Sequence, residues 1–259
     1  MATTAQRASS WVAASSLTQR IGSFALFIAV WQITADAVHS RLLPSASAVF
    51  MALEQESVNG PLLYQVGITL ARVAAAFVIA MVVGTAIGIV MGRSKTVDAL
   101  FDSWLVLLLN LPALVIIVLA YVWFGLTEAA AIGAVAVNKI PYTAVTLREG
   151  ARALDRNYSD MAACFHVGRW RTLRHVILPQ LYPYTFAAAR SGLALVWKIV
   201  LIVELLGRSN GVGFEIQLYF QQFDVTRILA YSIAFMVVIQ VIEWAIFQPL
   251  ERHAGRWRP

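Results

Sequence analysis

The sequence predicts an all-α, polytopic membrane protein with about six transmembrane helices. Of its 259 residues, 59% are hydrophobic and 13% are charged, whereas about a quarter of the residues in a typical soluble domain are charged. The mean hydropathy is +0.71. The apolar residues are collected in long runs, and a helix needs about 20 such residues to cross the hydrocarbon core of a bilayer. The charges are therefore too few to cover a soluble surface.

Six apolar runs are long enough to be spans. The first could instead be a secretory signal peptide, because Ala35-Asp36-Ala37 resembles a small-x-small cleavage site, but the long polar lead before it favours an uncleaved helix. We expect a cytoplasmic segment at 1–20, a transmembrane domain at 21–250 and a cytoplasmic tail at 251–259. The six runs cover 21–38, 66–91, 104–121, 129–147, 182–206 and 228–250.

The distribution of lysine and arginine predicts the orientation. With the amino terminus in the cytoplasm, the loops on that side hold 13 of these residues and the opposite loops hold 3. Basic residues accumulate on the cytoplasmic side of spans, so both termini are expected there. The basic residues flank apolar runs, which accounts for the net charge of +6 without a nucleic-acid partner.

Two local patterns predict details of the outer loop and of helix packing. Ser45 follows Leu43-Pro44 and is expected to cap a short helix that runs to Gln55. Gly84, Gly88 and Gly92 recur every four residues and share one face of the second run, which predicts close packing against another helix.

The residues give no sign of an enzyme. No G-x-x-x-x-G-K-[ST] sequence is present, so we expect this chain to bind no ATP. The four histidines are scattered and Cys164 is the single cysteine, which argues against a metal site and a disulfide framework. We therefore expect no cofactor on this chain.

A cytoplasmic segment at about 148–182 is too long to be a simple turn. A short helix is expected at 159–167, ended by Gly168. No lysine, arginine, aspartate or glutamate lies between Asp160 and Arg169, so this helix is expected to present apolar side chains, namely Met161, Ala162, Ala163 and Phe165. Such an exposed apolar tip marks a partner surface, unless it lies on lipid headgroups or on its own bundle.

Several short motifs together resemble the ABC importer permeases, in particular the nitrate/sulfonate/taurine/bicarbonate branch. The strongest are Ala162-Ala163, the arginine-rich stretch after it, and Val176-Ile177-Leu178-Pro179, which are similar to the family's cytoplasmic loop signature. The resemblance extends over nearly the whole chain, through Leu43-Pro44-Ser45, Thr69-Leu70-Ala71-Arg72-Val73, Gly84, Gly88, Gly92, Arg93-Ser94, Trp123-Phe124-Gly125, Glu204-Leu205-Leu206-Gly207 and Gly211-Val212-Gly213.

The resemblance implies a type I importer permease in a bacterial inner membrane. It implies two permease copies, two ATP-binding cassette subunits that hold ATP and Mg, an extracytoplasmic solute-binding protein, and a small anion as solute. The family's loop forms a coupling helix that contacts the ATPase, here carried by Asp160, Met161, Ala162, Ala163, Phe165, His166, Val167 and Gly168. His166 stands where the family places a glycine, and the acidic residue that opens the motif is displaced to Asp160, so the loop geometry is expected to differ.

Charged residues inside the spans are candidates for the transport pathway, because charge at membrane depth faces a bundle interior or an aqueous path. Lys139 lies midway along the fourth run beside Asn138, and Lys198 lies midway along the fifth beside Trp197. Arg72 and Arg190 lie nearer to span ends and are expected to anchor at an interface.

The partners of these lysines are left open by the sequence. Trp197 and Glu204 are seven residues apart and share a helix face, whereas Lys198 and Glu204 lie about 120° apart and are not an intrahelical pair. One interpretation is a structural ion pair between helices, joining Lys139 or Lys198 to Glu204 or Glu243. The other is a cationic path formed by Asn138, Lys139, Trp197, Lys198 and Glu204 that selects an anion.

Two other functions compete with the permease. A stand-alone secondary transporter or channel for small anions would not need an exposed apolar tip in the cytoplasm. An intramembrane enzyme would need a convergent catalytic cluster, and the sequence offers none. Nitrate, a sulfonate, bicarbonate and a carboxylate are equally compatible with the residues.

Overall fold

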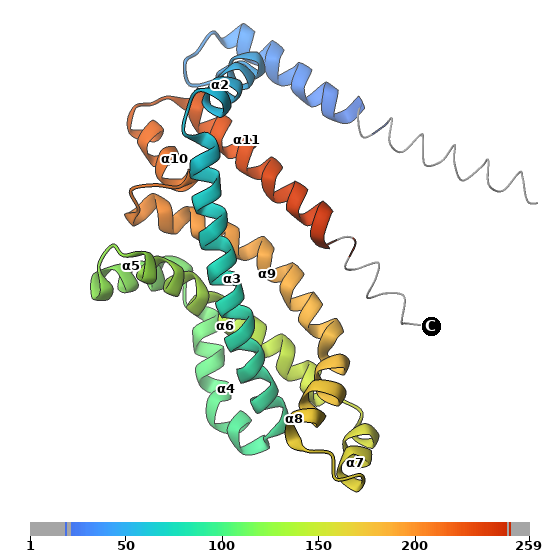
Figure 1. The fold of residues 1–259 in the computed structure, drawn as a ribbon. Helices are drawn as coiled ribbons and strands as arrows, with labels where there is room; N and C mark the ends of the chain where they lie inside the picture. The colour runs from blue at the N-terminus through green and yellow to red at the C-terminus, as the bar shows by residue number, and fades with distance from the viewer. Residues whose placement is uncertain (1–18, 20–21, 248, 250–259) are drawn as a thin grey trace, which may run out of the picture. The chain divides into compact units, whose positions relative to one another are not determined.

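The computed structural model describes residue 19, residues 22–247 and residue 249 (Figure 1). The described part is helical and contains no strand. Its elements, in order, are a helix at Gly22–Val38, α2 (Ala46–Val58), α3 (Leu62–Arg93), α4 (Lys95–Asn110), α5 (Ala113–Phe124), α6 (Glu128–Arg152), α7 (Arg156–Cys164), α8 (Arg169–Thr172), the π-helical turn η1 (Leu173–Ile177), α9 (Leu178–Gly207), α10 (Val212–Gln221), α11 (Val225–Ile242) and η2 (Glu243–Phe247).

The chain divides into two compact units. The larger consists of Leu62–Gln217 with Phe235–Pro259, and the smaller of Met1–Pro61 with Leu218–Ala234. In the smaller unit, the Ser45 hydroxyl accepts a hydrogen bond from the Ala48 amide and caps α2, as the sequence predicts. This helix continues three residues past Gln55, to Val58. The buried Glu56 carboxylate then ties α2 to Arg227 at 3.0 Å and to the Tyr231 hydroxyl at 3.1 Å.

The spans differ in part from the six predicted runs. Four described helices are long and apolar enough to cross a membrane, at Leu62–Arg93, Glu128–Arg152, Trp170–Gly207 and Val225–Ala245. Gly22–Val38 is a shorter apolar helix. The prediction of one continuous span at 104–121 is wrong, because α4 and α5 meet at a bend of 96°.

Pro112 causes the bend between α4 and α5. It is the residue before α5, at φ −60° and ψ 133°, and Leu111 before it is extended at φ −72° and ψ 126°. Proline disfavours the helical conformation in the residue that precedes it. The pair α4 and α5 is therefore a broken span or a re-entrant segment, and a hydropathy pattern does not distinguish these from a straight helix.

Helical structure extends into the predicted cytoplasmic segment from both sides. Helix α6 continues to Arg152, and helical structure resumes at Arg169 and leads through η1 into α9 without interruption. The predicted segment at about 148–182 thus holds the end of α6, all of α7, α8 and η1, and the start of α9, and its limits relative to the membrane stay a prediction. The part outside the long helices is α7 with its short connections, at the far end of α9 from α10 (Figure 1).

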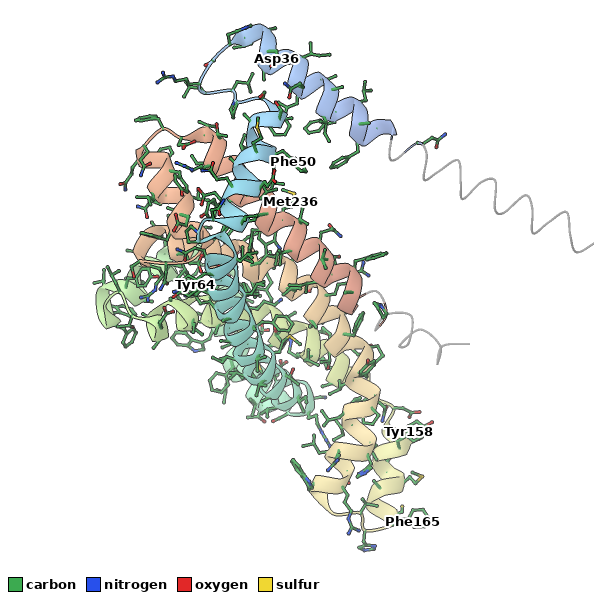
Figure 2. All side chains as sticks on the ribbon, turned by 45° about the horizontal axis from the view of Figure 1, so that its top comes forward. Asp36, Phe50, Tyr64, Tyr158, Phe165 and Met236 are labelled. Carbon is green, nitrogen blue, oxygen red and sulfur yellow. The ribbon has the colours of Figure 1, made fainter. Side chains whose placement is uncertain are left out.

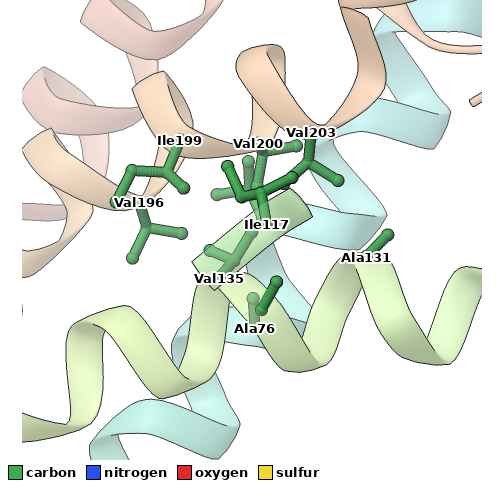
Figure 3. Close-up of a cluster of buried hydrophobic side chains, with 10 residues drawn as sticks. Ala76, Ile117, Ala131, Val135, Val196, Ile199, Val200 and Val203 are labelled. Carbon is green, nitrogen blue, oxygen red and sulfur yellow. The ribbon is translucent and has the colours of Figure 1, made fainter. Parts of the chain in front are cut away.

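The core of the larger unit lies between α3, α5, α6 and α9. A cluster of small and β-branched side chains packs there, including Ala76, Ile117, Ala131, Val135 and Val200, each about 1% exposed or less (Figure 3). Side chains this small let the helix backbones approach closely. This packing fixes the positions of α3, α6 and α9 relative to one another, and with them the positions of the polar side chains that these helices carry.

The glycine stripe of α3 packs against α6, which confirms the prediction of close packing. A Cβ atom at Gly84 would lie 2.9 Å from the Ile140 carbonyl oxygen, and one at Gly88 would lie 2.6 Å from that of Ala144. At Gly92 it would meet the Arg148 carbonyl at 2.7 Å. The two helices are thus in backbone contact over two turns, and no larger residue fits without moving one of them.

Candidate functional site

Helix α7 ends in a turn that involves the predicted coupling residues. The Phe165 amide donates to the Met161 carbonyl at 3.0 Å, and the Val167 amide donates to the Ala162 carbonyl at 2.9 Å. Between them His166 is left-handed, with φ of 50°. This is the pattern of a Schellman motif, in which glycine usually occupies the left-handed position. The helix therefore runs from Arg156 to Cys164, and the predictions of 159–167 and of Gly168 as its last capping residue are wrong.

The tip at α7 carries exposed apolar side chains on one face. Tyr158, Met161 and Phe165, spaced by three and four residues, are 52%, 49% and 77% exposed, and Figure 2 shows Phe165 at the extremity. Val167 and Trp170, which follow in the sequence, are also exposed.

The other predicted coupling residues differ in their exposure to solvent. Ala162 is 3% exposed, so the expectation that it belongs to the exposed tip is wrong. It lies on the face of α7 turned away from solvent, where α7 packs on η1. Asp160, His166 and Gly168 are exposed. Ala163 belongs to α7, but its side chain lies outside the described part.

A buried polar network lies at the opposite end of the larger unit. Glu204, near the end of α9, is fully buried and accepts hydrogen bonds from Thr69 Oγ1 at 2.9 Å, Arg72 Nη1 at 2.7 Å and the Gly213 amide at 2.9 Å. Arg72, itself 4% exposed, also binds Glu128 through two nitrogens at 2.6 and 2.8 Å. One cation thus joins α3, α6 and α9.

A second layer of bonds surrounds this ion pair. The Gln65 amide nitrogen donates to Glu215 at 2.6 Å, and its oxygen accepts from the Gly211 amide at 2.6 Å. Gly211 has a φ of 105°, and a side chain there would overlap the Glu204 carboxylate. Arg208 donates to Glu128 at 2.6 Å. The loop after α9 is therefore folded around the carboxylate, and the resembling motifs at 69–73, 204–207 and 211–213 are brought together.

These contacts correct two expectations about charge. Arg72 is not an interfacial anchor, because its guanidinium is buried in the network. The cationic partner of Glu204 is Arg72 and not Lys139 or Lys198. The helical spacing of Gln65, Thr69 and Arg72, at i, i+4 and i+7, places all three on one face of α3. This polar stripe within an apolar run is visible in the sequence and could have predicted a buried polar network, but it was overlooked.

Lys139 lies in the interior of the larger unit. It is 2% exposed, and among the described residues no carboxylate lies within ion-pairing distance of its ammonium group. Nζ lies 5.6 Å from the centroid of the Tyr142 ring. A Cβ atom at Gly192 would lie 3.0 Å from Nζ, so the glycine of α9 makes room for this side chain. Asn138 is also buried, at 8% exposed.

Lys198 lies on the outer face of α9. It is exposed and sits over the ring of the half-buried Trp197, 5.5 Å from the centroid. Trp197 in turn packs against Phe235 of α11, with ring centroids 6.0 Å apart. Exposed positions recur every three to four residues along this face, at 187, 190, 191, 194, 195, 198, 202 and 205. The structure thus places Lys139, Lys198 and Glu204 in three separate environments.

The described residues contain no group of histidine, cysteine, aspartate and glutamate side chains arranged to hold a metal ion. Residues 80–247 match the family described as "Binding-protein-dependent transport system inner membrane component". The chain belongs to this family. Its permease-like core, including α6, α7 and α9, lies within the matched residues.

Relatives and a solved structure agree with this assignment. The permease is 27% identical over 236 residues to SsuC of Bacillus subtilis strain 168, which is named for aliphatic sulfonate transport, over 90% of this chain and 85% of SsuC. It is 26% identical to the bicarbonate transport system permease protein CmpB of Synechococcus elongatus, over 78% of this chain and 77% of CmpB. A structure of the MetNI methionine ABC transporter in an inward-facing conformation has a TM-score of 0.65 at 17% identity and covers 76% of this chain and 98% of that chain. The predicted fold class, an all-α polytopic membrane protein with the fold of an ABC importer permease, is confirmed.

Proposed function

We propose that this permease imports a small anion in an ATP-driven complex, in which a separate ATPase docks on the tip at α7. Two permease chains, two ATPase subunits and an extracytoplasmic binding protein form the complex, both termini of the permease lie in the cytoplasm, and ATP and Mg are held by the ATPase alone. Family membership supports the subunit's role. The names of SsuC and CmpB, which refer to sulfonates and bicarbonate, support an anionic solute.

The exposed tip is the observation that carries the docking proposal. Tyr158, Met161 and Phe165 form an apolar stripe on a nine-residue helix. A surface helix this short is not stable through its helix propensity alone. The turn at His166 holds its carboxyl end in place. Fixed aromatic and methionine side chains of this kind are enriched at the centres of protein interfaces.

Basic residues along α9 support the choice of an anion. Its exposed face holds Arg190, Ser191 and Lys198 within a helix apolar enough to span the bilayer. Cations at this depth are costly against lipid and face another protein surface or water. A second permease copy that faces this stripe across an aqueous path would satisfy both requirements and give the path a positive potential.

The docking proposal is tested with Phe165→Asp in the complex purified with its ATPase. Loss of an interface hot spot costs about 2 kcal/mol, so ATPase affinity should fall roughly 30-fold, and solute-stimulated hydrolysis should fall with it. Phe223→Asp is the matched control, because Phe223 is 74% exposed in the turn between α10 and α11 and lies outside the tip. Unchanged ATPase retention in Phe165→Asp would refute the docking site.

The anion path is tested separately with Lys198→Met and Lys198→Arg. We expect Lys198→Met to reduce anion uptake in proteoliposomes while the ATPase remains bound, and Lys198→Arg to retain most of the uptake because it keeps the charge. Uptake kinetics that are the same in all three proteins would contradict a cationic path along α9 and would leave the docking proposal intact.

A further inference from the structure

An apolar groove lies between α3, α4 and α6. It has a volume of about 420 Å³ and is lined almost wholly by carbon atoms, among them those of Ala86, Val90, Phe101, Trp104 and Ile140. Several of these side chains, including Trp104 at 64% exposed, are open to the surroundings of the chain. At membrane depth such a groove is not filled by water, because it offers water no hydrogen-bonding partner.

A polar pocket adjoins this groove at Met91. Met91 lines both, and the pocket extends past Arg93, Lys95, Asp98 and Arg152, with a volume of about 580 Å³. It lies where α3 ends and α4 begins. The apolar groove and the polar pocket thus adjoin at Met91, and the two together are called the cavity below.

The polar end carries unpaired positive charge. Asp98 is bound by Arg152 and, at 3.3 Å, by Arg148, so these charges are already matched. Arg93 and Lys95 are exposed, and among the described residues neither has an acidic partner. An occupant that fits this end must bring a negative charge.

We propose that this cavity binds one anionic phospholipid, with an acyl chain in the groove and the phosphate beside Arg93 and Lys95. Basic pockets between transmembrane helices are typical sites for anionic headgroups. The apolar helix 22–38 of a second copy would fit the groove less well. Asp36 is the single acidic residue in this stretch of the sequence, so it brings one negative charge to two cations.

The test uses the full-length chain in nanodiscs of phosphatidylglycerol and phosphatidylcholine in equal amounts. Native mass spectrometry should show one phosphatidylglycerol retained per chain, and Arg93→Gln/Lys95→Gln should weaken retention about 30-fold, roughly fivefold for each cation. Arg171→Gln/Arg174→Gln is the matched control, since it removes two exposed arginines outside the cavity on the same predicted side. Ala86→Phe should also reduce retention by filling the groove.

A second measurement locates the lipid. Phosphatidylglycerol with brominated acyl chains should quench tryptophan fluorescence, and Trp104→Phe should remove part of the quenching because Trp104 lines the groove. Equal loss in both double variants, equal retention of phosphatidylcholine, or a crosslink that places helix 22–38 of a second copy in the groove would each overturn the proposal. None of these outcomes bears on the permease function.

Discussion

Replacing Arg72 with methionine should destabilise the permease by about 3–5 kcal/mol, the cost of leaving one member of a buried ion pair without its partner. The reason lies in Glu204, which is fully buried. After the change, its carboxylate keeps only the neutral donors Thr69 and the Gly213 amide. The loss of Arg72 destabilises the charge of Glu128 less, because Glu128 is 49% exposed and still pairs with Arg208.

The opposite substitution should cost less. Glu204→Gln leaves Arg72 bound to Glu128 through two nitrogens and to the Asn210 carbonyl at 2.9 Å. The amide group satisfies only part of the donors that face the carboxylate, so we expect a loss of about 1–3 kcal/mol. The double variant Arg72→Met/Glu204→Gln should then be more stable than Arg72→Met alone, because the uncompensated charge is gone.

The assay is thermal unfolding in detergent, followed by tryptophan fluorescence. For a chain of this size each kcal/mol shifts the Tm by about 2–4 °C, so Arg72→Met should lower the Tm by roughly 10 °C and the second change should restore several degrees. If the double variant unfolds at or below the Tm of Arg72→Met, the reasoning that Glu204 is a buried charge held by Arg72 is refuted.

Three further substitutions have expected signs. His166→Gly should stabilise the end of α7 by about 1 kcal/mol, since a left-handed residue with a Cβ atom carries that strain, and hydrogen exchange of α7 should slow. Gly88→Ala should lower the free energy of unfolding by about 1–3 kcal/mol, because the new methyl group forces α3 away from α6. Gly67→Ala should raise it by up to about 1 kcal/mol, because no atom lies within 4 Å of the new Cβ. Equal Tm values for the two variants would contradict the backbone contact between α3 and α6. Lys139→Met should increase the free energy of unfolding by at least about 1 kcal/mol, which raises the Tm, and it should lower anion uptake. A lower Tm would show that the ammonium group has a partner.

Much of the fold follows from local patterns. The hydropathy runs located the helices around α3, α6, α9 and α11. The stripe from Gly84 to Gly92 predicted a close helix contact on this face of α3, and the structure identifies the partner as α6. The break between α4 and α5 was not predicted, because Pro112 in an apolar run permits a kink, a re-entrant turn or a straight helix, and packing decides among them. The extension of α6 to Arg152 was not predicted, because Arg148 and Arg152 were interpreted as loop residues, although they pair with Asp98 of α4.

The candidate site was predicted less completely than the fold. The exposed stripe through Met161 and Phe165 could be located from the absence of charge, but the register of α7 depended on His166, whose left-handed conformation is not evident from its residue type. The network around Glu204 joins residues more than 130 positions apart, and sequence alone does not determine which cation reaches a buried carboxylate. Both lysines were therefore considered as its partner, and both assignments were wrong.

Two cations are buried in the described part of the chain, and they differ in what folding and transport require of them. Arg72 is held by Glu204 and Glu128, so its charge is compensated within the chain. Lys139 is equally buried, and the described part of the chain supplies no carboxylate for it, while Gly192 leaves the space that it occupies. A cation that no described residue compensates lowers stability, so a role of Lys139 in transport requires a negative charge that arrives from outside the chain. Natural proteins depart from the most stable choice mainly at functional positions. The prediction for Lys139→Met therefore separates the two roles: a more stable protein that transports less would place Lys139 in the pathway, and a less stable one would place it in the fold.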